Sequence, residues 1–568
     1  MARYELDLGE DGLPEIHVPH RGHALLENNV YNHGTAFTME EREALGLLGL
    51  LPAAVRTLEE QVERAYEHVT SSDDPLDRYL ALADLESRNA TLYYRVLVEH
   101  LEELLPVVYT PTVGRACQRF SHLFRRGRGL WITPKHRGRI AKVLRNAPFE
   151  GVRLICVTDN ERILGLGDQG AGGMGIPVGK LDLYVVGAGI HPTKTLPISL
   201  DVGTDNPDLL ADPFYIGWRG ERLRGPAYDE MVEELVVAVK DVFPRALLQW
   251  EDFKKANAFT LLDRYADRLL SFNDDIQGTA GVALAGVVAA SRISGVPMRE
   301  QRIVMLGAGA AGVGIARILA AELDHLGLSA EDARRAVAIL DSEGLLVDTR
   351  DYRDAYKQKF AWPAAWASAI GLDPSRPIDL LDVVRAMKPT VLIGTSGIPG
   401  TFGEGVVREM ARHCASPAIF PFSNPNSKAE ARPKDLVAWT EGRALIAAGS
   451  PFAPVAYGDR TFDIAQGNNV YVFPGVGLGA LVSGATKIVD SMFAAAAHAI
   501  GEQLDASDIA ARRLYPPLAN LRAISRAVAI EVGLHAMELG LAPPLSADEL
   551  AARVDAATWF PRYARVRP

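Results

Sequence analysis

The amino-acid sequence predicts a multidomain α/β protein. Helical patterns fill the region from about residue 40 to residue 105, and short β-rich runs separated by glycine follow from about residue 132. From about residue 301 strands and helices alternate, which is typical of a doubly wound sheet with helices on both faces. At about 100–200 residues per domain, a chain of 568 residues fits about three or four domains.

The composition is that of an ordinary globular protein, with 48% apolar and 23% charged residues. The net charge of −11 and the absence of a basic block argue against nucleic acid as a partner. The N-terminal residues lack the apolar core of a signal peptide, and no apolar run approaches the ~18 residues of a membrane span. Cys117, Cys156 and Cys414 stand singly, which favours a reducing compartment. The expected location is therefore the cytoplasm, without membrane attachment.

Several elements can be predicted from hydrophobic periodicity. One helical segment opens at Met39, and Asp73–Pro75 interrupts the region before a helix that contains Tyr79–Leu104. Farther along, the sequence predicts a buried strand and two more helices, at Val152–Asp159, Tyr228–Val242 and Ala519–Leu539.

A glycine fingerprint predicts a dinucleotide site. The strand-like run Gln301–Leu306 leads into GAGAAG at residues 307–312, and a helical segment follows it. Gly307 permits a tight turn, Gly309 lets the backbone approach a pyrophosphate, and Gly312 permits close helix packing. The helix N-terminus then offers N–H groups and the positive end of its dipole to the phosphates.

A second strand supports this interpretation. Ala336–Leu340 ends in Asp341, whose carboxylate can accept hydrogen bonds from the adenine ribose. The offset from the glycines exceeds the usual ~20 residues, and a longer crossover helix would explain the difference. We expect Ala308 and Ala310 in the fingerprint, and Ser342 beside the acid, to contact the cofactor as well.

The segment Gly165–Gly170 also matches G-x-G-x-x-G. No helical pattern follows it, only more glycine and then Ile176-Pro177, so a mobile or close-packed loop is the better interpretation. Such a loop can still line a site, because glycine permits close approach of the backbone to a ligand.

Two pairs of adjacent acids are candidates for metal binding. Glu251-Asp252 ends an apolar run, and Asp274-Asp275 precedes a helix rich in alanine and glycine. Adjacent acids on a strand point to opposite faces, so the members of each pair are expected to divide their roles. Oxygen ligands of this kind suit Mg²⁺ or Mn²⁺. By spacing alone, a solvated acidic loop or a helix cap remains open.

Lys180 and Tyr109 are candidates for proton transfer. Lys180 lies in an apolar, glycine-bounded segment, where desolvation or a nearby cation can remove its proton at neutral pH. An ion-paired structural lysine is the alternative. Tyr109 lies at a helix-to-turn boundary, where a tyrosine taken alone is more often a packing residue.

Taken together, these segments resemble the malic enzymes. The matching blocks follow the order found in that family and extend over nearly the whole chain. They are residues 109–114, 161–168, 173–180, 250–253, 272–279, 423–425 and 466–469.

The resemblance implies a role for each candidate residue. Tyr109 would be the general acid and Lys180 the general base, with Asp274 assisting the lysine through a hydrogen bond. The metal ligands would be Glu251, Asp252 and Asp275. The residues at substrate and nicotinamide would be Arg162, Asn424, and Asn468 or Asn469.

The resemblance also implies an architecture in which a Rossmann-type domain is inserted into an α/β substrate domain. A helical N-terminal domain (1–127) would precede the first part of the substrate domain (128–274). The NAD-binding domain (275–467), the second part of the substrate domain (468–535) and a C-terminal helix and tail (536–568) would follow. Because family members are usually dimers or tetramers, the resemblance also implies a homodimer or homotetramer.

The implied reaction is the oxidative decarboxylation of malate to pyruvate, together with decarboxylation of oxaloacetate. Malate, pyruvate and other small dicarboxylates would be its small-molecule partners. A malolactic enzyme, which yields lactate without net reduction of the cofactor, is the nearest alternative. A catalytically silent dinucleotide-binding regulator is another, although it would not need Lys180, Tyr109 and the acids.

The sequence gives conflicting signals for the cofactor. Asp341 would repel a 2′-phosphate, and Glu343 adds negative charge, which favours NAD. Ser342 is small, however, and Lys357 falls where NADP-preferring relatives carry a lysine that can bond to the phosphate. The expectation is NAD first, with measurable use of NADP.

Overall fold

The computed structural model describes residues 7–8, 14–352 and 354–567. The chain forms two compact units. The first unit runs to Phe253 and also contains the chain from Asp555 onward, and the second unit is Lys254–Val554. The five-part division expected from the resemblance stays a prediction.

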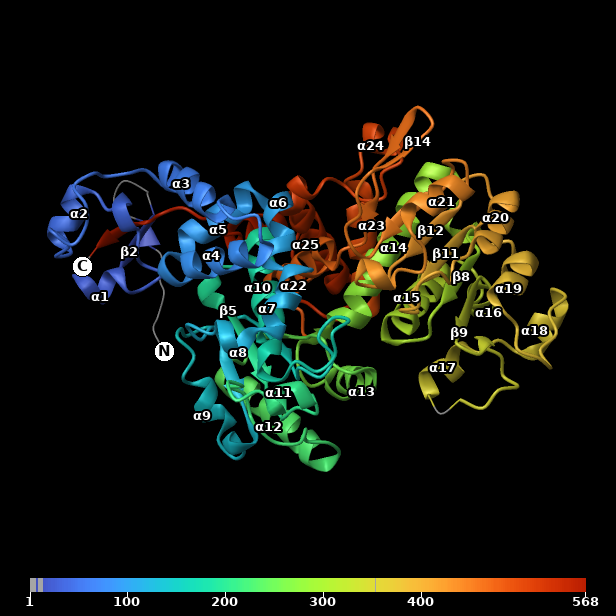
Figure 1. The fold of residues 1–568 in the computed structure, drawn as a ribbon, viewed down its shortest axis with the longest axis horizontal. Coiled ribbons are helices and arrows are strands. Elements are labelled where there is room, and N and C mark those ends of the chain that lie inside the picture. The colour runs from blue at the N-terminus through green and yellow to red at the C-terminus, as the bar shows by residue number, and fades with distance from the viewer. Residues whose placement is uncertain (1–6, 9–13, 353, 568) are drawn as a thin grey trace. The chain divides into compact units, whose positions relative to one another are not determined.

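Helices make up most of the N-terminal part of the first unit (Figure 1). Its helices are α1 (His23–Leu26), α2 (Met39–Ala44), α3 (Leu58–Thr70), α4 (Pro75–Arg88), α5 (Ala90–Glu99), α6 (Leu101–Val108), α7 (Thr112–Gln118), α8 (Phe120–Leu123), α9 (Ile140–Leu144), α10 (Gly175–Ala188), α11 (Pro207–Ala211) and α12 (Pro226–Val242). The helix expected at 228–242 is confirmed as α12, with Pro226 in its first turn.

The single helix expected over Tyr79–Leu104 is wrong, because the structure divides this segment into α4, α5 and α6. Asn89 ends α4 in an extended conformation (φ −156°, ψ 92°). Its side chain then accepts a hydrogen bond from the Leu92 N–H (2.9 Å) and so caps α5. A cap residue satisfies N–H groups that the helix itself leaves unpaired, so the chain breaks here although its apolar pattern continues.

Strands β3 (Leu130–Ile132), β5 (Thr195–Leu200), β4 (Leu154–Thr158) and β6 (Leu247–Trp250) lie side by side in this order and run parallel. The strand expected at 152–159 is confirmed as β4. All residues of β4 and β6 are buried, as expected for a parallel sheet covered on both faces. The chain leaves β4 and β6 at the same edge of the sheet, and the first candidate site residues follow there.

Helix α10, which carries Lys180, was not predicted as a helix. A short 3₁₀ turn (Gly170–Met174) leads from the glycine loop directly into it, so the expectation that no helix follows this loop is wrong. Helix α10 is buried on nearly every side, packing on β4 and β5 and on α5 and α7. A helix that is apolar all round has no amphipathic period, which is why the sequence pattern concealed it.

The C-terminal chain returns to the first unit. Strand β17 (Arg565–Arg567) pairs in parallel with β2 (Pro14–His17), which in turn pairs with β1 (Asp7–Leu8). The Tyr563 hydroxyl donates to the Gln61 Oε1 atom (2.6 Å) and accepts from the Asn89 Nδ2 group (2.7 Å). Residues more than 450 positions apart therefore share one hydrogen-bonded cluster.

The second unit contains a sheet in the order β10 (Gly344–Leu345), β9 (Val337–Asp341), β8 (Ile303–Leu306), β11 (Val391–Gly394), β12 (Ala418–Pro421), β13 (Leu445–Ala448) and β16 (Ala465–Gln466). All its strands are parallel except β10, which turns back along β9. From β8 the chain goes first to β9 on one side and then crosses to β11 on the other. In such sheets ligands bind at this reversal, beyond the carboxyl ends of the strands.

The helices of this unit lie on both faces of the sheet, with α14 and α15 on one side and α19, α20 and α21 on the other (Figure 1). They are α13 (Lys255–Tyr265), α14 (Thr279–Ser294), α15 (Ala310–His325), α16 (Ala330–Arg335), α17 (Ala355–Phe360), α18 (Ala364–Ala369), α19 (Leu380–Met387), α20 (Glu404–His413), α21 (Pro433–Trp439), α22 (Phe473–Ser483), α23 (Asp490–Glu502), α24 (Ala506–Ala510), α25 (Leu521–Glu538) and α26 (Ala547–Ala557). Other strands are β7 (Ser271–Asn273), β14 (Val455–Tyr457) and β15 (Arg460–Phe462). The strand–turn–helix unit at the fingerprint, the strand ending in Asp341 and the late helix α25 are confirmed, and α15 with α16 forms the long crossover.

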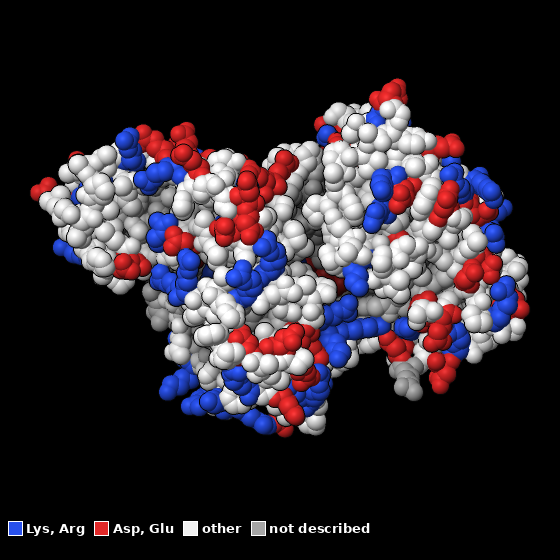
Figure 2. Space-filling view, in the orientation of Figure 1, with Lys and Arg blue, Asp and Glu red and all other residues white. Residues whose placement is uncertain are grey.

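Among the described residues, one helix is long and apolar enough to cross a membrane, the 21-residue segment Asp274–Ser294. The expectation that no apolar run approaches this length therefore has an exception. Of its apolar window, 78% is buried inside the protein, where α14 packs on α15 and α23. Acidic and basic side chains are interspersed over the face seen in Figure 2.

We expect Asn89→Ala to lower the free energy of unfolding of the first unit by about 1–2 kcal/mol, because the cap of α5 and the bond to Tyr563 are lost together. Urea unfolding followed by circular dichroism measures the change. Ser329→Ala, which removes the exposed cap of α16 and an exposed hydrogen bond to Asp332, is the matched control and should cost less. A stability equal to that of the parent would show that the break at Asn89 is maintained by packing alone.

Candidate active site

The first unit brings together the predicted base, the predicted acid and one predicted metal ligand. Lys180, on α10, is only 3% exposed, and its Nζ atom lies 3.0 Å from the Glu251 Oε1 atom. The same Nζ atom stands 5.3 Å from the centroid of the Tyr109 ring. Tyr109 is the buried residue at which α6 ends. Three residues far apart in sequence thus meet at one buried point.

Glu251 is held by a hydrogen-bond chain that the sequence did not reveal. The Gln249 Nε2 group donates to the Glu251 Oε2 atom (2.7 Å), and the Tyr184 hydroxyl donates to the Gln249 Oε1 atom (2.5 Å). Lys180 and Tyr184 are four residues apart on α10 and therefore lie on one face of it. One turn of this helix holds Glu251 directly through the lysine and indirectly through the tyrosine.

Asp252 follows as a second buried carboxylate. Strand β6 ends at Trp250, so the two acids lie beyond the strand, and the rule of alternating strand faces does not apply to them. Asp252 has a positive φ (54°), and its Oδ2 atom accepts the Leu164 N–H (3.0 Å). Burial, together with the charge of Glu251, raises the pKa of Asp252 to about 8. Two adjacent buried carboxylates are suited to a bound cation, which would offset the repulsion between the charges of Glu251 and Asp252.

The glycine loop that precedes α10 is fixed by a buried arginine. The Arg222 side chain donates through Nε to the Asp168 Oδ2 atom (3.0 Å) and through Nη1 to the Asp159 carbonyl oxygen (2.7 Å). Within the loop, Ile163 and Gly167 form an antiparallel bridge. Arg162 is exposed on this loop, and its charge acts to lower the pKa of Asp252. The loop therefore presents the predicted carboxylate-binding arginine beside the acid pair. Arg222 was missed, because nothing in its local sequence marks it as buried.

In the second unit, Asp274 and Asn469 lie together. The Asn469 Nδ2 group donates to the Asp274 Oδ2 atom (2.8 Å) and to the Thr279 hydroxyl (3.1 Å). Asp274 is fully buried, and Asp275 beside it is partly exposed. Asn468 is a cap residue instead, since its Oδ1 atom accepts the Val470 N–H (3.0 Å) at the start of a short 3₁₀ helix. Asn469 is thus the asparagine directed at the acid.

The fingerprint glycines have the geometry that a dinucleotide loop requires. Gly307 has φ +116°, and a Cβ there would lie 2.5 Å from the Thr395 carbonyl carbon. A Cβ at Gly312 would lie 1.9 Å from the Gly307 carbonyl oxygen, so only glycine fits. A Cβ at Gly309 would meet no atom within 4 Å. The backbone at Gly309 is therefore open to a ligand, while the other two glycines serve the turn and the packing.

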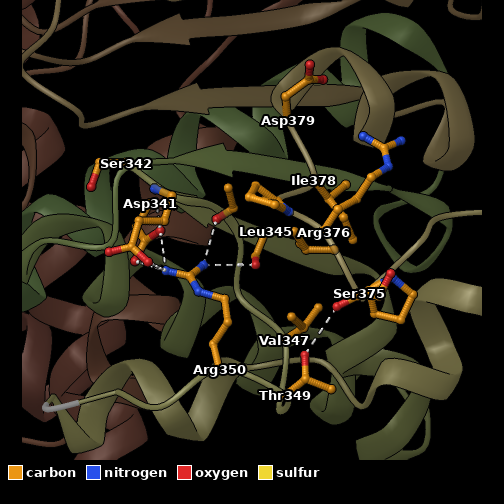
Figure 3. A pocket seen from close by; sticks show the side chains of 14 residues that line it. Asp341, Ser342, Leu345, Val347, Thr349, Arg350, Ser375, Arg376, Ile378 and Asp379 are labelled. Carbon is orange, nitrogen blue, oxygen red and sulfur yellow. Dashed lines mark hydrogen bonds and ion pairs between the residues drawn. The ribbon is translucent and has the colours of Figure 1, made fainter.

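Asp341 ends β9 at the edge of a cavity of about 840 Å³ (Figure 3). Its carboxylate accepts hydrogen bonds from Arg350 (3.0 Å), from Lys357 (2.8 Å) and from the Glu343 N–H (2.9 Å). Burial opposes ionisation, but these bonds outweigh it and lower the pKa of Asp341. Ser342 lines the same cavity. Lys357, predicted as a phosphate ligand, is here paired with the acid, and Arg350 was missed because it lies in an unremarkable loop.

Asn424 follows β12 at the carboxyl edge of this sheet, and its side chain is exposed and accepts a hydrogen bond from the Ser450 hydroxyl. Beside it, the Ser423 hydroxyl donates to the Glu430 Oε1 atom (2.6 Å). The fully buried Glu430 also accepts the Ser396 N–H (2.7 Å), which ties the loop after β11 to the loop after β12. Glu430 was also missed, because its partner Ser396 lies 34 residues away in another loop.

Comparison with known proteins identifies the family. Residues 86–266 match the family described as "Malic enzyme, N-terminal domain", and residues 276–537 match "Malic enzyme, NAD binding domain". The chain is 48% identical over 562 residues to an "NAD-dependent malic enzyme" of Pectobacterium carotovorum subsp. carotovorum, covering 98% of this chain and 99% of the relative. The chain belongs to the malic enzyme family. A second malic enzyme, "NAD-dependent malic enzyme 2" of Photobacterium profundum, is 46% identical over 97% of this chain and 98% of its own length.

Solved malic enzyme structures share the fold. The malic enzyme of Entamoeba histolytica has a TM-score of 0.55 at 21% identity and covers 90% of each chain. The malic enzyme of Pyrococcus horikoshii has a TM-score of 0.54 at 22% identity, with 80% of this chain and 89% of that chain covered. The predicted resemblance and fold class are therefore confirmed.

The raised pKa of Asp252 predicts how the stability of the metal-free protein depends on pH. The folded-state pKa of this carboxyl (about 8) exceeds its ordinary value of 3.8, so its ionisation lowers the free energy of unfolding of the protein. Its stabilising contribution is therefore full below that ordinary value and is lost as pH rises toward 8. The slope is at most about 1.4 kcal/mol per pH unit.

We expect the thermal midpoint of the metal-free parent, measured by calorimetry with a chelator present, to fall between pH 5 and pH 8. Asp252→Asn should remove part of this fall, because the amide does not titrate. Parallel curves for the two proteins would mean that the Asp252 carboxyl is already ionised at pH 5.

Proposed function

We propose that this chain catalyses the oxidative decarboxylation of (S)-malate to pyruvate and CO₂ with reduction of NAD, and that it also decarboxylates oxaloacetate. The observation that carries the proposal is the buried cluster of Lys180, Tyr109 and Glu251 in a chain 48% identical to an NAD-dependent malic enzyme. Malolactic activity and a silent regulator are not favoured, because the relatives are named as NAD-dependent malic enzymes and the acid–base residues are present.

Lys180 and Tyr109 carry the proton transfers. Lys180 is ion-paired with Glu251, and a cation bound to that acid would favour the neutral form of the lysine. Neutral Lys180 then takes the proton of the C2 hydroxyl, with Asp274 assisting through a hydrogen bond, as the C2 hydrogen leaves as hydride. NAD, when bound, supplies the acceptor for that hydride. Loss of the distal carboxylate as CO₂ leaves the enolate of pyruvate, and Tyr109 donates its phenol proton to C3. Groups of this kind contribute about 100- to 10,000-fold each.

We propose Glu251, Asp252 and Asp275 as ligands of Mg²⁺ or Mn²⁺. Their carboxylate oxygens suit a hard cation. Burial and the charge of Glu251 raise the pKa of Asp252, so a cation bound there would stabilise its ionised form. A bound cation supplies Lewis acidity that stabilises the negative charge developing on the C2 oxygen. Arg162 and Asn469, or Asn468 beside it, hold the carboxylates and oxygens of the substrate.

The dinucleotide is proposed to lie along the fingerprint. The open backbone at Gly309 and the close fits at Gly307 and Gly312 support this placement, with Ala308 and Ala310 completing the loop. The helix N-terminus of α15 is then the phosphate site. Asp341 and Ser342 face the adenine ribose, and Asn424 lies toward nicotinamide. We further propose a cytoplasmic homodimer or homotetramer.

NAD is proposed as the first cofactor, with NADP used less efficiently. Asp341 remains ionised and would repel a 2′-phosphate, which supports NAD. Lys357 and Arg350 neutralise this acid in part, so that NADP is not strictly excluded.

The function is tested by a product assay with malate and Mn²⁺, using NAD⁺ and NADP⁺ in turn. Pyruvate and reduced cofactor should form in equal amounts. Lactate without net reduction would identify a malolactic enzyme instead, and no turnover of malate would overturn the proposal.

Lys180→Ala should lower kcat by at least about 100-fold, as expected for a lost general base, and leave NADH affinity nearly unchanged. Stopped-flow turnover and fluorescence titration with NADH measure the two quantities. Turnover within a few-fold of the parent would remove Lys180 from the mechanism.

Lys357→Ala should lower kcat/KM with NADP⁺ by about tenfold or more, because it removes a charged hydrogen-bond donor and leaves the Asp341 charge less balanced. Efficiency with NAD⁺ should change little. Lys359→Ala is the matched control, since this lysine lies on the same helix and stands over the Tyr356 ring. A parent that prefers NADP⁺ by more than tenfold would contradict the weight given to Asp341.

A further inference from the structure

Helix α10 approaches the predicted acid more closely than any side chain would allow. A Cβ at Gly179 would lie 2.8 Å from the Tyr109 Cδ2 atom and 3.0 Å from the Val108 carbonyl oxygen. One turn earlier on the same face, a Cβ at Gly175 would lie 2.8 Å from the Cys117 Sγ atom. Glycine is a poor helix former. The two glycines therefore weaken α10 locally and in return let the end of α6 and helix α7 lie directly against its backbone.

A second contact joins α10 to the N-terminal helices, at Asp182, which follows Lys180 in the sequence. Asp182 is 2% exposed, and its carboxylate accepts the hydroxyl groups of Tyr93 and Tyr94, each at 2.8 Å. Arg128 binds the same carboxylate through both terminal nitrogens, at 3.0 and 2.5 Å. These four donors match the four lone-pair positions of a carboxylate. A charge so completely bonded fixes α5 and the loop of Arg128, which supply its donors.

Both contacts act on the segment formed by α5 and α6. Tyr93 and Tyr94 lie on α5, which is followed directly by α6, and Tyr109 ends α6 with its N–H donating to the Leu105 carbonyl oxygen (3.0 Å). Helix α10 thus contacts this segment at Gly179 and at Asp182. Lys180 lies between the two contacts in sequence, so its place relative to the Tyr109 ring is set from both sides.

We propose that Gly179 and Asp182 are positioning residues that fix the Tyr109 phenol relative to the Lys180 amine, and thereby set the proton transfer to C3. This inference rests on the proposed function, because Tyr109 is there the acid that protonates the enolate of pyruvate. We expect a methyl side chain at Gly179 to displace the Tyr109 ring, its nearest neighbour, more than Lys180, which the bond to Glu251 holds. Protonation at C3 is therefore more sensitive to the change than hydride transfer is, since Lys180 serves the latter.

The two steps can be measured separately. With Mg²⁺ and NADH bound, exchange of the pyruvate methyl protons for solvent deuterons, followed by NMR, reports the transfer through Tyr109. Reduction of oxaloacetate by NADH reports the step that uses Lys180. In Gly179→Ala we expect exchange to fall by at least about tenfold and oxaloacetate reduction by less than about threefold, with NADH affinity, from fluorescence titration, within about twofold of the parent. Equal losses in both reactions, or exchange within twofold of the parent, would overturn the proposal.

A second variant tests the other contact without adding bulk. Tyr93→Phe/Tyr94→Phe deletes both hydroxyl bonds to Asp182, together with the bond that the Tyr94 hydroxyl accepts from Arg128 (2.8 Å). The Arg128–Asp182 ion pair keeps both of its direct hydrogen bonds. Exchange should again fall more than oxaloacetate reduction, by about threefold or more. Tyr515→Phe, which removes a buried hydroxyl bonded to the Val282 carbonyl oxygen (2.8 Å) in the second unit, is the matched control and should change neither rate. An effect of the control as large as that of the double variant would count against positioning.

The activities of the parent protein show whether a negative result contradicts this inference or the proposed function. If the parent neither oxidises malate nor exchanges pyruvate protons, the proposed function is wrong. If the parent does both and the variants show no selective loss of exchange, only the positioning role is wrong.

Discussion

The ion pair between Lys180 and Glu251 is the interaction on which the first unit depends. Both side chains are almost fully buried, and a buried charge is tolerated only where other groups bond to it. Gln249 and Tyr184 supply such bonds to Glu251. Lys180 thereby ties α10 to the residues that follow β6. The other faces of α10 are largely apolar and pack on β4, β5, α5 and α7.

In the second unit, buried carboxylates organise the ligand edge of the sheet in a similar way. Glu430 joins the loops after β11 and β12, and Asp341 joins the end of β9 to Arg350 and Lys357. Each of these acids is paired with several donors from different segments. The loops beyond the strands are therefore held in place by charged hydrogen bonds and do not depend on apolar packing alone.

Local patterns were sufficient for elements whose two faces differ or whose ends carry a clear signal. Strand β4, the unit from β8 to β9 and helix α12 could be predicted in this way. Helix α10 could not, because burial on all sides removes the periodic signal. The break at Asn89 was also missed, since the apolar pattern continues across a cap that only the hydrogen bonds reveal.

For the site, the resemblance supplied Tyr109, Lys180 and Glu251, and the structure brings these three together. The residues that hold them could not be found from sequence. Arg222 and Gln249 bond to partners 54 and 65 residues away, and Glu430 bonds to Ser396, 34 residues away. Arg350 bonds to Asp341, nine residues away, from a loop with an unremarkable sequence. Such contacts depend on the tertiary fold, so no local pattern contains them.

The pairing of β17 with β2 has a consequence for synthesis of the chain. Residues 559–567 leave the ribosome only after the entire second unit, yet they complete the sheet and the Tyr563 cluster of the first. During translation Gln61 and Asn89 therefore lack their Tyr563 partner until some 300 intervening residues have been made. The first unit is thus synthesised first but completed last. A nascent chain that stops within the second unit lacks β17, and its N-terminal part is left without that strand for chaperones and proteases to meet.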